Sequence, residues 1–366
     1  MFKYLQTPVF TDKSIARGFA KTILDEVSRI KAKRVVIDPI NVIGNILTSQ
    51  EYRSFLYNLI VMGFKSLGVT SVLIAELPIG GEVIGHGFEE FIADIVFILK
   101  MVKYKGLVKR VIEVRKIREN PIVSMEAEYI IDTGGIKLFS PYFLELKGGY
   151  GLERVTTGLS GLDRMLNGGL LKGSATMIVG PSGSGKTLIA LNIAIANALR
   201  GKKVIYTSYE ESREQLINTI RSMGYDYDAI KDKLIVTGIN PAGHTPASLY
   251  HYIVNLLDKE KADIRIADGI TALEKHFGTE AYINLTRALL TKAKSLGITY
   301  ILTKAENVED LKHHEISTLV DIIIALYLQR VNNSIERKIA ILKFRGSPHD
   351  NRVRTLKLEG GKVTII

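Results

Sequence analysis

The segment whose residue types point most directly to chemistry is a glycine-rich run at residues 180–187. It reads GPSGSGKT and fits the pattern G-x-x-x-x-G-K-[ST] at every fixed position. Glycines let backbone N–H groups turn inward around a phosphate, and a helix that follows adds its positive N-terminal end. The pattern predicts a site for ATP, with the phosphates held by Gly180, Ser182, Gly183, Ser184, Gly185, Lys186 and Thr187.

Two residues of this run have distinct predicted tasks, and a third residue is needed beside them. The Lys186 ammonium should reach the β- and γ-phosphates, and the Thr187 hydroxyl should bind Mg²⁺. A carboxylate must also hold the metal, and Asp268 at the end of the apolar run IRIAD is the candidate. The alternative for Asp268 is a buried strand residue that only caps a turn.

A pair of adjacent carboxylates follows the next predicted strand. Glu210 and Glu211 come directly after KVIYTSY. One of them is expected to polarise the water that attacks the γ-phosphate. Negative charge is also favoured at the start of a helix, and the helical run SREQLINTI follows at once. Taken alone, the pair fits either interpretation.

These residues require a framework of alternating strands and helices. The predicted strands are VVIDPI, SVLIAEL, DIVFIL, ATMIVG, KVIYTSY, DIRIADG and TYILTKA. Helical stretches such as 14–30 and 187–199 separate them. Strands that are apolar throughout are typical of a mainly parallel sheet covered by helices on both faces. The predicted fold class is therefore α/β.

The chain also contains an internal repeat. RVVIDPI resembles IRIADGI, FIADIVFIL resembles TLVDIIIAL, VRKIRENP resembles LKFRGSPH, and GGIKLF resembles GGKVTI. Asp38 and Asp268 lie 230 residues apart, and Asp94 and Asp321 lie 227 residues apart. Because the order is kept and the offset hardly drifts, the matches predict two copies of one fold.

The first copy, residues 1–148, is predicted to be incomplete, and the second copy, residues 149–366, complete. The first copy begins at a predicted strand, 2–9, which matches 233–240, so it has no phosphate-binding loop of its own. Residues 146–157 are the predicted linker. Strands beside the missing central strand should lose hydrogen-bond partners and expose apolar faces. We expect a polypeptide that starts further upstream; the alternative is a half-domain that docks on a partner or on the second copy.

Composition narrows the function classes. Hydrophobic residues make up 46% and charged residues 24%, which is typical of a folded soluble protein. Cysteine is absent, which excludes a disulfide framework and a cysteine metal site. The longest apolar runs, 91–99 and 319–328, are too short to cross a bilayer, so a cytoplasmic protein without a membrane partner is predicted. The net charge of +11, of which residues 1–148 carry +4, fits a nucleic-acid surface or a lysine-rich solvated one.

Six segments of the second copy occur in an order typical of one family: TTGLSGLDRMLNGGLLKGS, GPSGSGKTLIALN, YTSYEES, IADGI, EISTLVDIII and KFRGSPH. Residues 155–366 resemble a KaiC domain, in the RecA-like group of P-loop ATPases. Residues 1–145 resemble the later part of a first KaiC domain. The phosphate-binding loop alone is not specific to this family, whereas the combination of segments is. The resemblance implies a RecA-like core preceded by a partial second copy of the same fold.

The resemblance also assigns roles to residues. Glu210 and Glu211 become the catalytic glutamates, with Glu210 as the water activator. Lys343 and Arg345 would reach the γ-phosphate bound by a neighbouring subunit, with His349 nearby, which implies a homo-oligomeric ring of six. Positive charge supplied in this way would offset charge developing on the transferred phosphoryl group. Without the resemblance, KFRGSPH fits a solvated basic hairpin equally well.

Two hydroxyl residues and several departures from the family pattern complete this comparison. Ser317 and Thr318 lie where the clock KaiC second domain is autophosphorylated; adjacent hydroxyls before an apolar strand are also common turn formers. Gly269 follows Asp268 where the family often has a hydroxyl residue, so help from that hydroxyl is expected to be lost. In the first copy, Pro39 follows the aspartate, and Glu119 replaces the glycine of the R-G pair.

Three functions are consistent with these features. The favoured one is an Mg-dependent, ATP-hydrolysing regulatory ring, with regulatory protein partners and an autokinase activity as further hypotheses. The alternative is a RecA/RadA-like DNA-binding ATPase or recombination accessory factor, supported by the net charge. The aromatic residues are not clustered with arginines for base stacking, so nucleic acid is not the favoured partner. A nucleotide-dependent scaffold with negligible turnover is the third hypothesis.

Overall fold

The computed structural model describes residues 3–6, 8, 11–77, 83–121, 126–140, 149–310, 315–359 and 362–366. The chain divides into two compact units. The first unit comprises residues 1–99 and 112–126, and the second comprises residues 100–111 and 127–366. The repeat predicts a boundary between residues 148 and 149, where one sequence copy ends and the next begins. This boundary separates sequence copies and not these compact units, and it stays a prediction.

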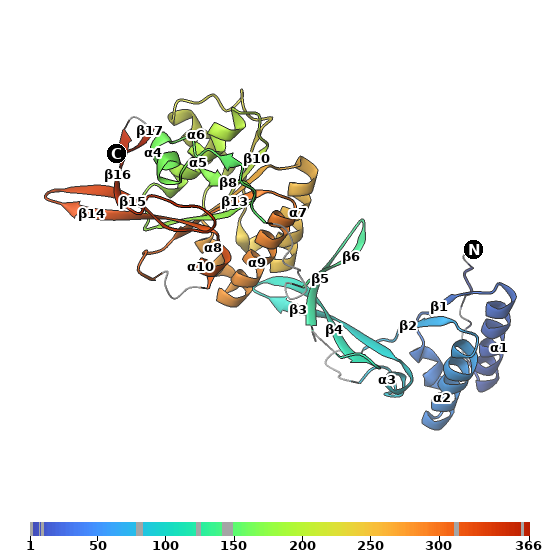
Figure 1. Ribbon diagram of the computed structural model, residues 1–366. Helices are drawn as coiled ribbons and strands as arrows, with labels where there is room; N and C mark the ends of the chain where they lie inside the picture. The colour runs from blue at the N-terminus through green and yellow to red at the C-terminus, as the bar shows by residue number, and fades with distance from the viewer. Residues whose placement is uncertain are drawn as a thin grey trace. The chain divides into compact units, whose positions relative to one another are not determined.

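The second unit contains a nine-stranded sheet (Figure 1). Its order is β11 (Leu234–Gly238), β10 (Val204–Ser208), β12 (Ile264–Asp268), β13 (Thr299–Ala305), β9 (Ala175–Gly180), β14 (Ile322–Val331), β15 (Ser334–Phe344), β16 (Arg354–Glu359) and β17 (Lys362–Ile365). The pairs from β11 to β14 are parallel, and those from β14 to β17 are antiparallel. The prediction of a mainly parallel sheet in an α/β fold is therefore confirmed.

Helices cover both faces of this sheet. One apolar cluster joins it to α5 (Lys186–Ala198) and α6 (Arg213–Ser222), and the other joins it to α7 (Pro246–Glu260), α8 (Thr271–Phe277) and α9 (Thr279–Ser295). Capping boxes begin α6 and α7, which fixes where these helices start. The shorter elements are α4 (Ser160–Met165), α10 (Ile316–Leu319), β7 (Arg154–Val155), β8 (Leu170–Leu171), β5 (Glu126–Asp132) and β6 (Gly135–Phe139).

The first unit is smaller. Its elements are α1 (Lys13–Arg29), β1 (Arg34–Ile37), a 3₁₀ helix (Asn41–Ile46), α2 (Ser49–Leu56), a π-helical segment (Tyr57–Lys65), β2 (Thr70–Leu73) and α3 (Glu89–Ile92); β3 (Ile95–Tyr104) and β4 (Leu107–Ile117) begin or end in it. β1 and β2 pair in parallel with Arg34 opposite Thr70, the register that β12 and β13 show with Ile264 opposite Thr299.

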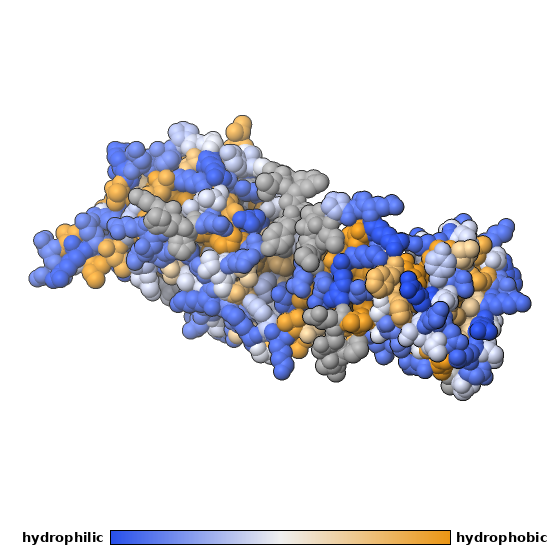
Figure 2. Space-filling view, turned by 90° about the horizontal axis from the view of Figure 1, so that it is seen from below, coloured by the Kyte–Doolittle hydropathy of each residue, from blue (hydrophilic) through white to orange (hydrophobic). Residues whose placement is uncertain are grey.

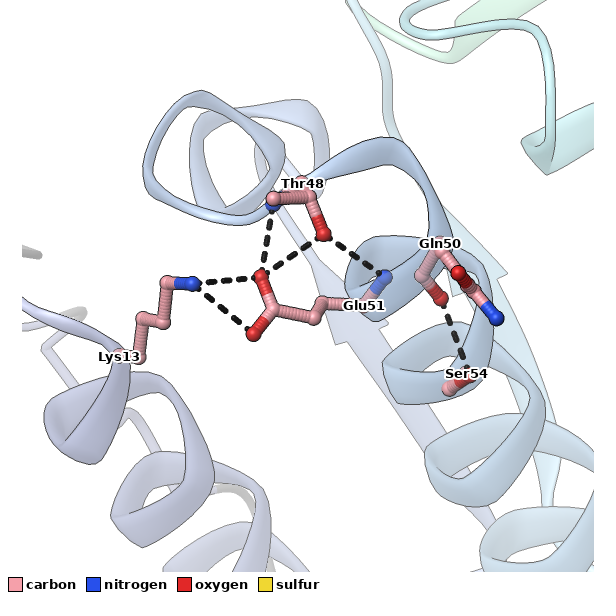
Figure 3. A network of polar contacts seen from close by, with 5 residues as sticks. All are labelled: Lys13, Thr48, Gln50, Glu51 and Ser54. Atoms are coloured by element: carbon pink, nitrogen blue, oxygen red, sulfur yellow. Dashed lines mark hydrogen bonds and ion pairs between the residues drawn. The ribbon is translucent and has the colours of Figure 1, made fainter.

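A polar network in the first unit joins α1 to the start of α2 (Figure 3). Thr48 and Glu51 form a capping box in which the Glu51 carboxylate accepts from the Thr48 backbone N–H at 2.9 Å. The Lys13 ammonium donates to both oxygens of this carboxylate at 2.9 and 2.7 Å. The lysine therefore links the two helices, and its hydrogen bond contributes most to lowering the pKa of Glu51 to about 2.

The two sequence copies share equivalent contacts as well as equivalent residue types. The Lys343 ammonium donates to the Ser317 carbonyl at 2.7 Å, and the Lys116 ammonium donates to the Glu90 carbonyl at 2.6 Å. Both partners are offset by 227 residues between the copies. A second repeated contact is the ion pair Lys294–Asp321, which corresponds to Lys65–Asp94. The repeat is thus a repeat of local structure.

The first unit exposes an apolar face whose counterpart within the second unit is buried. Exposed fractions of 50–62% occur at Val36, Val72, Ile95, Phe97 and Leu99. The repeat aligns these positions with Ile266, Ile301, Ile322, Ile324 and Leu326, whose exposed fraction is 0%. In the second unit this face packs against α5, and β9 lies between β13 and β14. Figure 2 shows apolar areas that reach the surface among hydrophilic ones.

Two expectations about chain segments were wrong in detail. Of the predicted strand at 2–9, the described residues 3–6 and 8 form no strand. The matching strand β11 is held by β10, and no described strand of the first unit stands in that place. The predicted linker ends early, because Arg154–Val155 pairs with β8; its residues 146–148 lie outside the described residues. Among the described residues, no helix is long and apolar enough to cross a membrane.

Candidate nucleotide-binding site

The glycine-rich run joins the central strand β9 to helix α5. Every residue of β9 is buried, and the loop leaves the sheet at Gly180. A Cβ on Gly180 would lie 2.6 Å from the Leu326 carbonyl oxygen, so only glycine fits there. Gly183 and Gly185 have φ values of +77° and +101°, which side-chain-bearing residues rarely adopt. The glycines of the motif are therefore required by the turn that the loop makes.

The loop contains a hydrogen-bond donor that has no acceptor among the described residues. Ser184 is fully buried, and its Oγ has no hydrogen-bond partner among the described residues. No described side chain caps the N-terminus of α5, and the first N–H groups of a helix have no acceptor within the helix itself. An orphaned hydroxyl and an uncapped helix start facing one loop fit a bound phosphate.

Lys186 is held inside this loop. Its ammonium donates to the carbonyl oxygens of Gly180 and Pro181, at 2.9 Å each. Burial lowers the pKa of Lys186, and the charges of Asp268 and Glu210 oppose that shift. The lysine is thus placed at the loop before any ligand binds, and an anion in the loop would favour its charged form.

Asp268 and Thr187 meet where a metal ion is expected. Asp268 ends β12 and is 3% exposed. The Thr187 hydroxyl lies 3.1 Å from Asp268 Oδ2, and the Thr303 hydroxyl contacts Oδ1. Hydroxyl and carboxylate oxygens suit Mg²⁺. Within the described ranges, no three His, Asp or Glu side chains converge on a metal position, so phosphate and water would have to complete the coordination.

The paired glutamates are fixed by the last residue of β10. The backbone N–H groups of Glu210 and Glu211 both donate to the Ser208 hydroxyl, at 3.2 and 2.9 Å. Ser208 lies opposite Asp268 in the β10–β12 register, which brings the pair to the metal-binding edge. Burial, followed by the charges of Asp268 and Glu210, raises the pKa of Glu211. Glu210 is exposed, so it is the better placed of the two to take a proton from water.

The structure does not bring the basic segment KFRGSPH to the phosphate loop of the same chain. The Arg345 backbone N–H donates to the Asp321 carbonyl at 2.9 Å, and the Asp321 N–H donates to the Ala175 carbonyl at 2.8 Å. Ala175 begins β9 and Gly180 ends it. Five residues of strand at about 3.3 Å each separate the two ends by roughly 16 Å. Arg345 is exposed at this far edge.

The other residues predicted for the subunit boundary lie at the same far edge. The Lys343 ammonium donates to the carbonyls of Ser317 and Val320 at 2.7 Å, and burial lowers its pKa. The Thr318 hydroxyl donates to the Glu315 carbonyl at 2.7 Å. The His349 ring lies 6.4 Å from the Phe344 ring. These residues form one group, separate from the phosphate loop of their own chain.

Three residues of the site were not identified from the sequence. Ser208 and Thr303 orient the glutamates and Asp268, and the Arg337 guanidinium donates to the Gly183 carbonyl at 3.1 Å. Thr303 and Ser208 each stand near the end of an apolar strand, which is the one signal that could have singled them out. Arg337 is one of several basic residues on β15 and carries no such signal.

The first copy uses the arginine of its basic pair differently. The Arg118 guanidinium donates to Asp94 Oδ1 at 3.2 Å and to the Phe91 carbonyl at 2.8 Å. Its charge is thus engaged within the first unit. Lys116 and Arg118 match Lys343 and Arg345 in spacing. The Arg118 side chain, however, contacts residues just before the start of β3. This geometry favours a structural role for the pair.

Comparison with known proteins gives this arrangement a family. The sequence profile described as "ATPase: KaiC" matches residues 4–142 and again residues 155–366. The two matches together span nearly the whole chain. The chain belongs to the KaiC ATPase family. The KaiC matches cover both sequence copies, and the second contains the phosphate loop, Asp268 and the paired glutamates.

Curated KaiC proteins resemble the chain over most of its length. It is 29% identical over 345 residues to the circadian clock protein KaiC3 of Synechocystis sp., a match that covers 91% of this chain and 68% of that protein. It is 28% identical to KaiC2 of the same organism, across 93% of this chain and 61% of that protein. The circadian clock oscillator protein KaiC of Synechococcus elongatus is 29% identical, with 93% and 68% covered.

Proposed function

We propose that residues 149–366 bind ATP with Mg²⁺ and hydrolyse the bond between its β- and γ-phosphates, as the catalytic part of a regulatory ATPase. The observation that carries this proposal is the convergence of three strand ends. β9 supplies the phosphate loop, β12 supplies Asp268, and β10 supplies the paired glutamates. The carboxyl ends of parallel strands are where α/β proteins bind such ligands.

The residues divide the work as follows. Loop N–H groups and the Ser184 hydroxyl hold the phosphates, and Lys186 adds a charge beside them. Magnesium, when bound near Thr187 and Asp268, supplies the positive charge that neutralises the phosphate oxygens. Glu210 accepts the proton of the attacking water. Glu211 adds the negative charge of its carboxylate beside that water.

A neighbouring copy completes the site in this proposal. Lys343 and Arg345 lie at the far edge of their own sheet, roughly 16 Å of strand away from their own phosphate loop. Arg345 is exposed and Lys343 is held close behind it. Cations placed in this way can serve a nucleotide bound by the next subunit, which requires a head-to-tail arrangement of copies, and we infer that this arrangement closes into a ring. The resemblance to KaiC domains supports six subunits.

The hydroxyls of Ser317 and Thr318 belong to the same proposal. They lie on α10 at the far edge, beside the Lys343 ammonium. A phosphoryl group transferred there would come from ATP on the adjacent subunit. Each phosphate would add roughly −1.5 to −2 charge at the subunit boundary and change how copies pack. The resemblance supports the acceptor pair, and the position of α10 supports transfer between subunits.

A RecA/RadA-like DNA-binding ATPase is the second candidate, and the net charge of +11 favours it. Single-stranded DNA should then stimulate hydrolysis, with binding that weakens steeply as salt rises. The relatives described above are circadian clock proteins, which favours regulation instead.

Incubation of the full chain with ATP labelled on the γ-phosphate tests the proposal. Label should appear as free phosphate, and label on the protein would map to Ser317 or Thr318. Label that stays on ATP while the nucleotide is bound would leave a scaffold without turnover. Release that rises only when single-stranded DNA is added would favour the DNA-binding ATPase.

A further inference from the structure

One buried hydroxyl bonds both the Asp268 carboxylate and the backbone of the residue that follows it. Thr303, on β13, is 1% exposed. Its Oγ1 accepts from the Gly269 backbone N–H at 2.8 Å and contacts Asp268 Oδ1. A hydroxyl has a single proton, and the Gly269 N–H can only donate. The proton of Thr303 is therefore directed at the Asp268 carboxylate.

Thr303 bonds only one oxygen of the Asp268 carboxylate, Oδ1. The Thr187 hydroxyl on α5 lies closer to the other oxygen, at 3.1 Å from Oδ2 and 3.4 Å from Oδ1. Asp268 is 3% exposed, so its hydrogen bonds to the protein largely set the orientation of the carboxylate. Hydrogen bonds to the outer oxygen of a metal-binding carboxylate fix its direction and are costly to remove.

The same hydroxyl also fixes the peptide against which Glu210 packs. A Cβ on Gly269 would come within 2.8 Å of Glu210 Cδ, so the glutamate side chain lies directly against the Gly269 backbone. A hydroxyl residue at 269 would displace Glu210. The hydroxyl therefore comes from the neighbouring strand, where Thr303 binds the Gly269 N–H and leaves room for Glu210.

We propose that Thr303 is a positioning residue that orients Asp268 toward the metal and fixes the Gly269 peptide beneath Glu210, a role that rests on the proposed ATPase function. Thr303 itself touches neither substrate nor metal. Its loss should weaken the response to Mg²⁺ more than the grip on the nucleotide, because the phosphate loop has no hydrogen bond to Thr303 among the described residues.

The test measures binding, without turnover. A fluorescent ATP analogue is titrated onto the full chain in EDTA and then at increasing Mg²⁺. Thr303→Val should raise the Mg²⁺ concentration needed for half-maximal enhancement about tenfold, with affinity in EDTA within about twofold. Thr303→Ser, which keeps the hydroxyl, should behave like the unsubstituted chain. Thr207→Val is the matched control, since it removes a buried strand hydroxyl that bonds only Thr237 among the described residues.

Three results would overturn the proposal. Thr303→Val could respond to Mg²⁺ like the unsubstituted chain, Thr303→Ser could be as impaired as Thr303→Val, or Thr207→Val could be equally impaired. Circular dichroism checks the fold, and Thr303→Ala replaces the valine variant if that variant does not fold. Failure of the unsubstituted chain to bind the analogue at any Mg²⁺ concentration would reject the proposed function together with this role.

Discussion

The side chain of Glu210 lies directly against the backbone of Gly269. A Cβ at residue 269 would lie 2.8 Å from Cγ and from Cδ of the glutamate. Residue 269 also has a φ of +75°, a left-handed conformation that favours glycine. The absence of a side chain after Asp268 is thus what lets the proposed water activator occupy its place.

Gly269→Ala is predicted to slow hydrolysis at least tenfold while ATP stays bound, because Glu210 must move aside. The left-handed backbone should add a cost of about 1–2 kcal/mol to the folded state. Steady-state turnover and equilibrium binding measure the two effects. Gly297→Ala is the control, since Gly297 has a φ of +70° and open space around it. Equal turnover in the two variants would contradict the packing argument.

Glu210→Gln is predicted to reduce ATP hydrolysis by about 10² to 10⁴ while leaving ATP affinity nearly unchanged. The amide keeps the shape of the side chain but cannot accept the proton of water. Single-turnover hydrolysis of bound ATP measures the chemical step. Glu214→Gln, an exposed change on α6, serves as the control. Full hydrolysis in Glu210→Gln, with loss in Glu211→Gln, would exchange the roles of the two glutamates.

Mixing two inactive variants tests whether subunits share a site. Lys186→Ala keeps Arg345 but loses the phosphate grip, and Arg345→Ala does the opposite. A mixed ring places an intact Arg345 beside an intact phosphate loop, so hydrolysis should partly recover on mixing. Lys186→Ala mixed with a Lys186→Ala, Arg345→Ala double variant should show no recovery. A mixture of the two single variants that stays inactive, although mixed rings are detected by mass spectrometry, would reject sharing.

The network of Lys13, Thr48 and Glu51 predicts a pH-dependent start of α2. The pKa of Glu51 is lowered from 4.5 to about 2 in the folded chain, chiefly by the hydrogen bond from Lys13. Its stabilisation is therefore complete above about pH 4.5 and is lost as pH falls toward 2. Hydrogen exchange of residues 49–56 should be faster in Glu51→Gln than in the unsubstituted chain at pH 6.

At pH 2 that difference in exchange should be much smaller, because the Glu51 carboxyl of the unsubstituted chain is then about half protonated. Lys31→Gln is the control for a change of charge outside the network, and it should leave this exchange unaltered. A difference between Glu51→Gln and the unsubstituted chain that is constant from pH 6 to pH 2 would show that the carboxylate does not carry the effect.

Local elements of the complete copy were predictable because strong apolar runs are bounded by turn residues. The runs at 175–180 and 299–305 are strands β9 and β13, and the helix expected at 187–199 is α5, shifted by one residue. The phosphate loop was identifiable because its glycines are required by positive φ and close packing. Short-range constraints of this kind are written in adjacent residues.

Features that depend on strand order were not predictable. Thr303 contacts Asp268 because β13 lies between β12 and β9, an order that the sequence does not state. The far-edge position of Arg345 depends on the antiparallel register of β14 and β15. The predicted strand at 2–9 was matched to β11 by sequence, yet its described residues have no neighbouring strand to pair with. A strand needs a partner as well as a pattern.

The central claim is that the loop between β9 and α5 binds a triphosphate with its metal. Equilibrium dialysis of the folded chain against labelled Mg·ATP tests this most directly, with Lys172→Ala as a surface-lysine control. The account predicts saturable uptake near one ATP per chain, lost or weakened at least about 100-fold in Lys186→Ala and unchanged in Lys172→Ala. No uptake by the folded chain, or uptake that Lys186→Ala leaves unaltered, would contradict it.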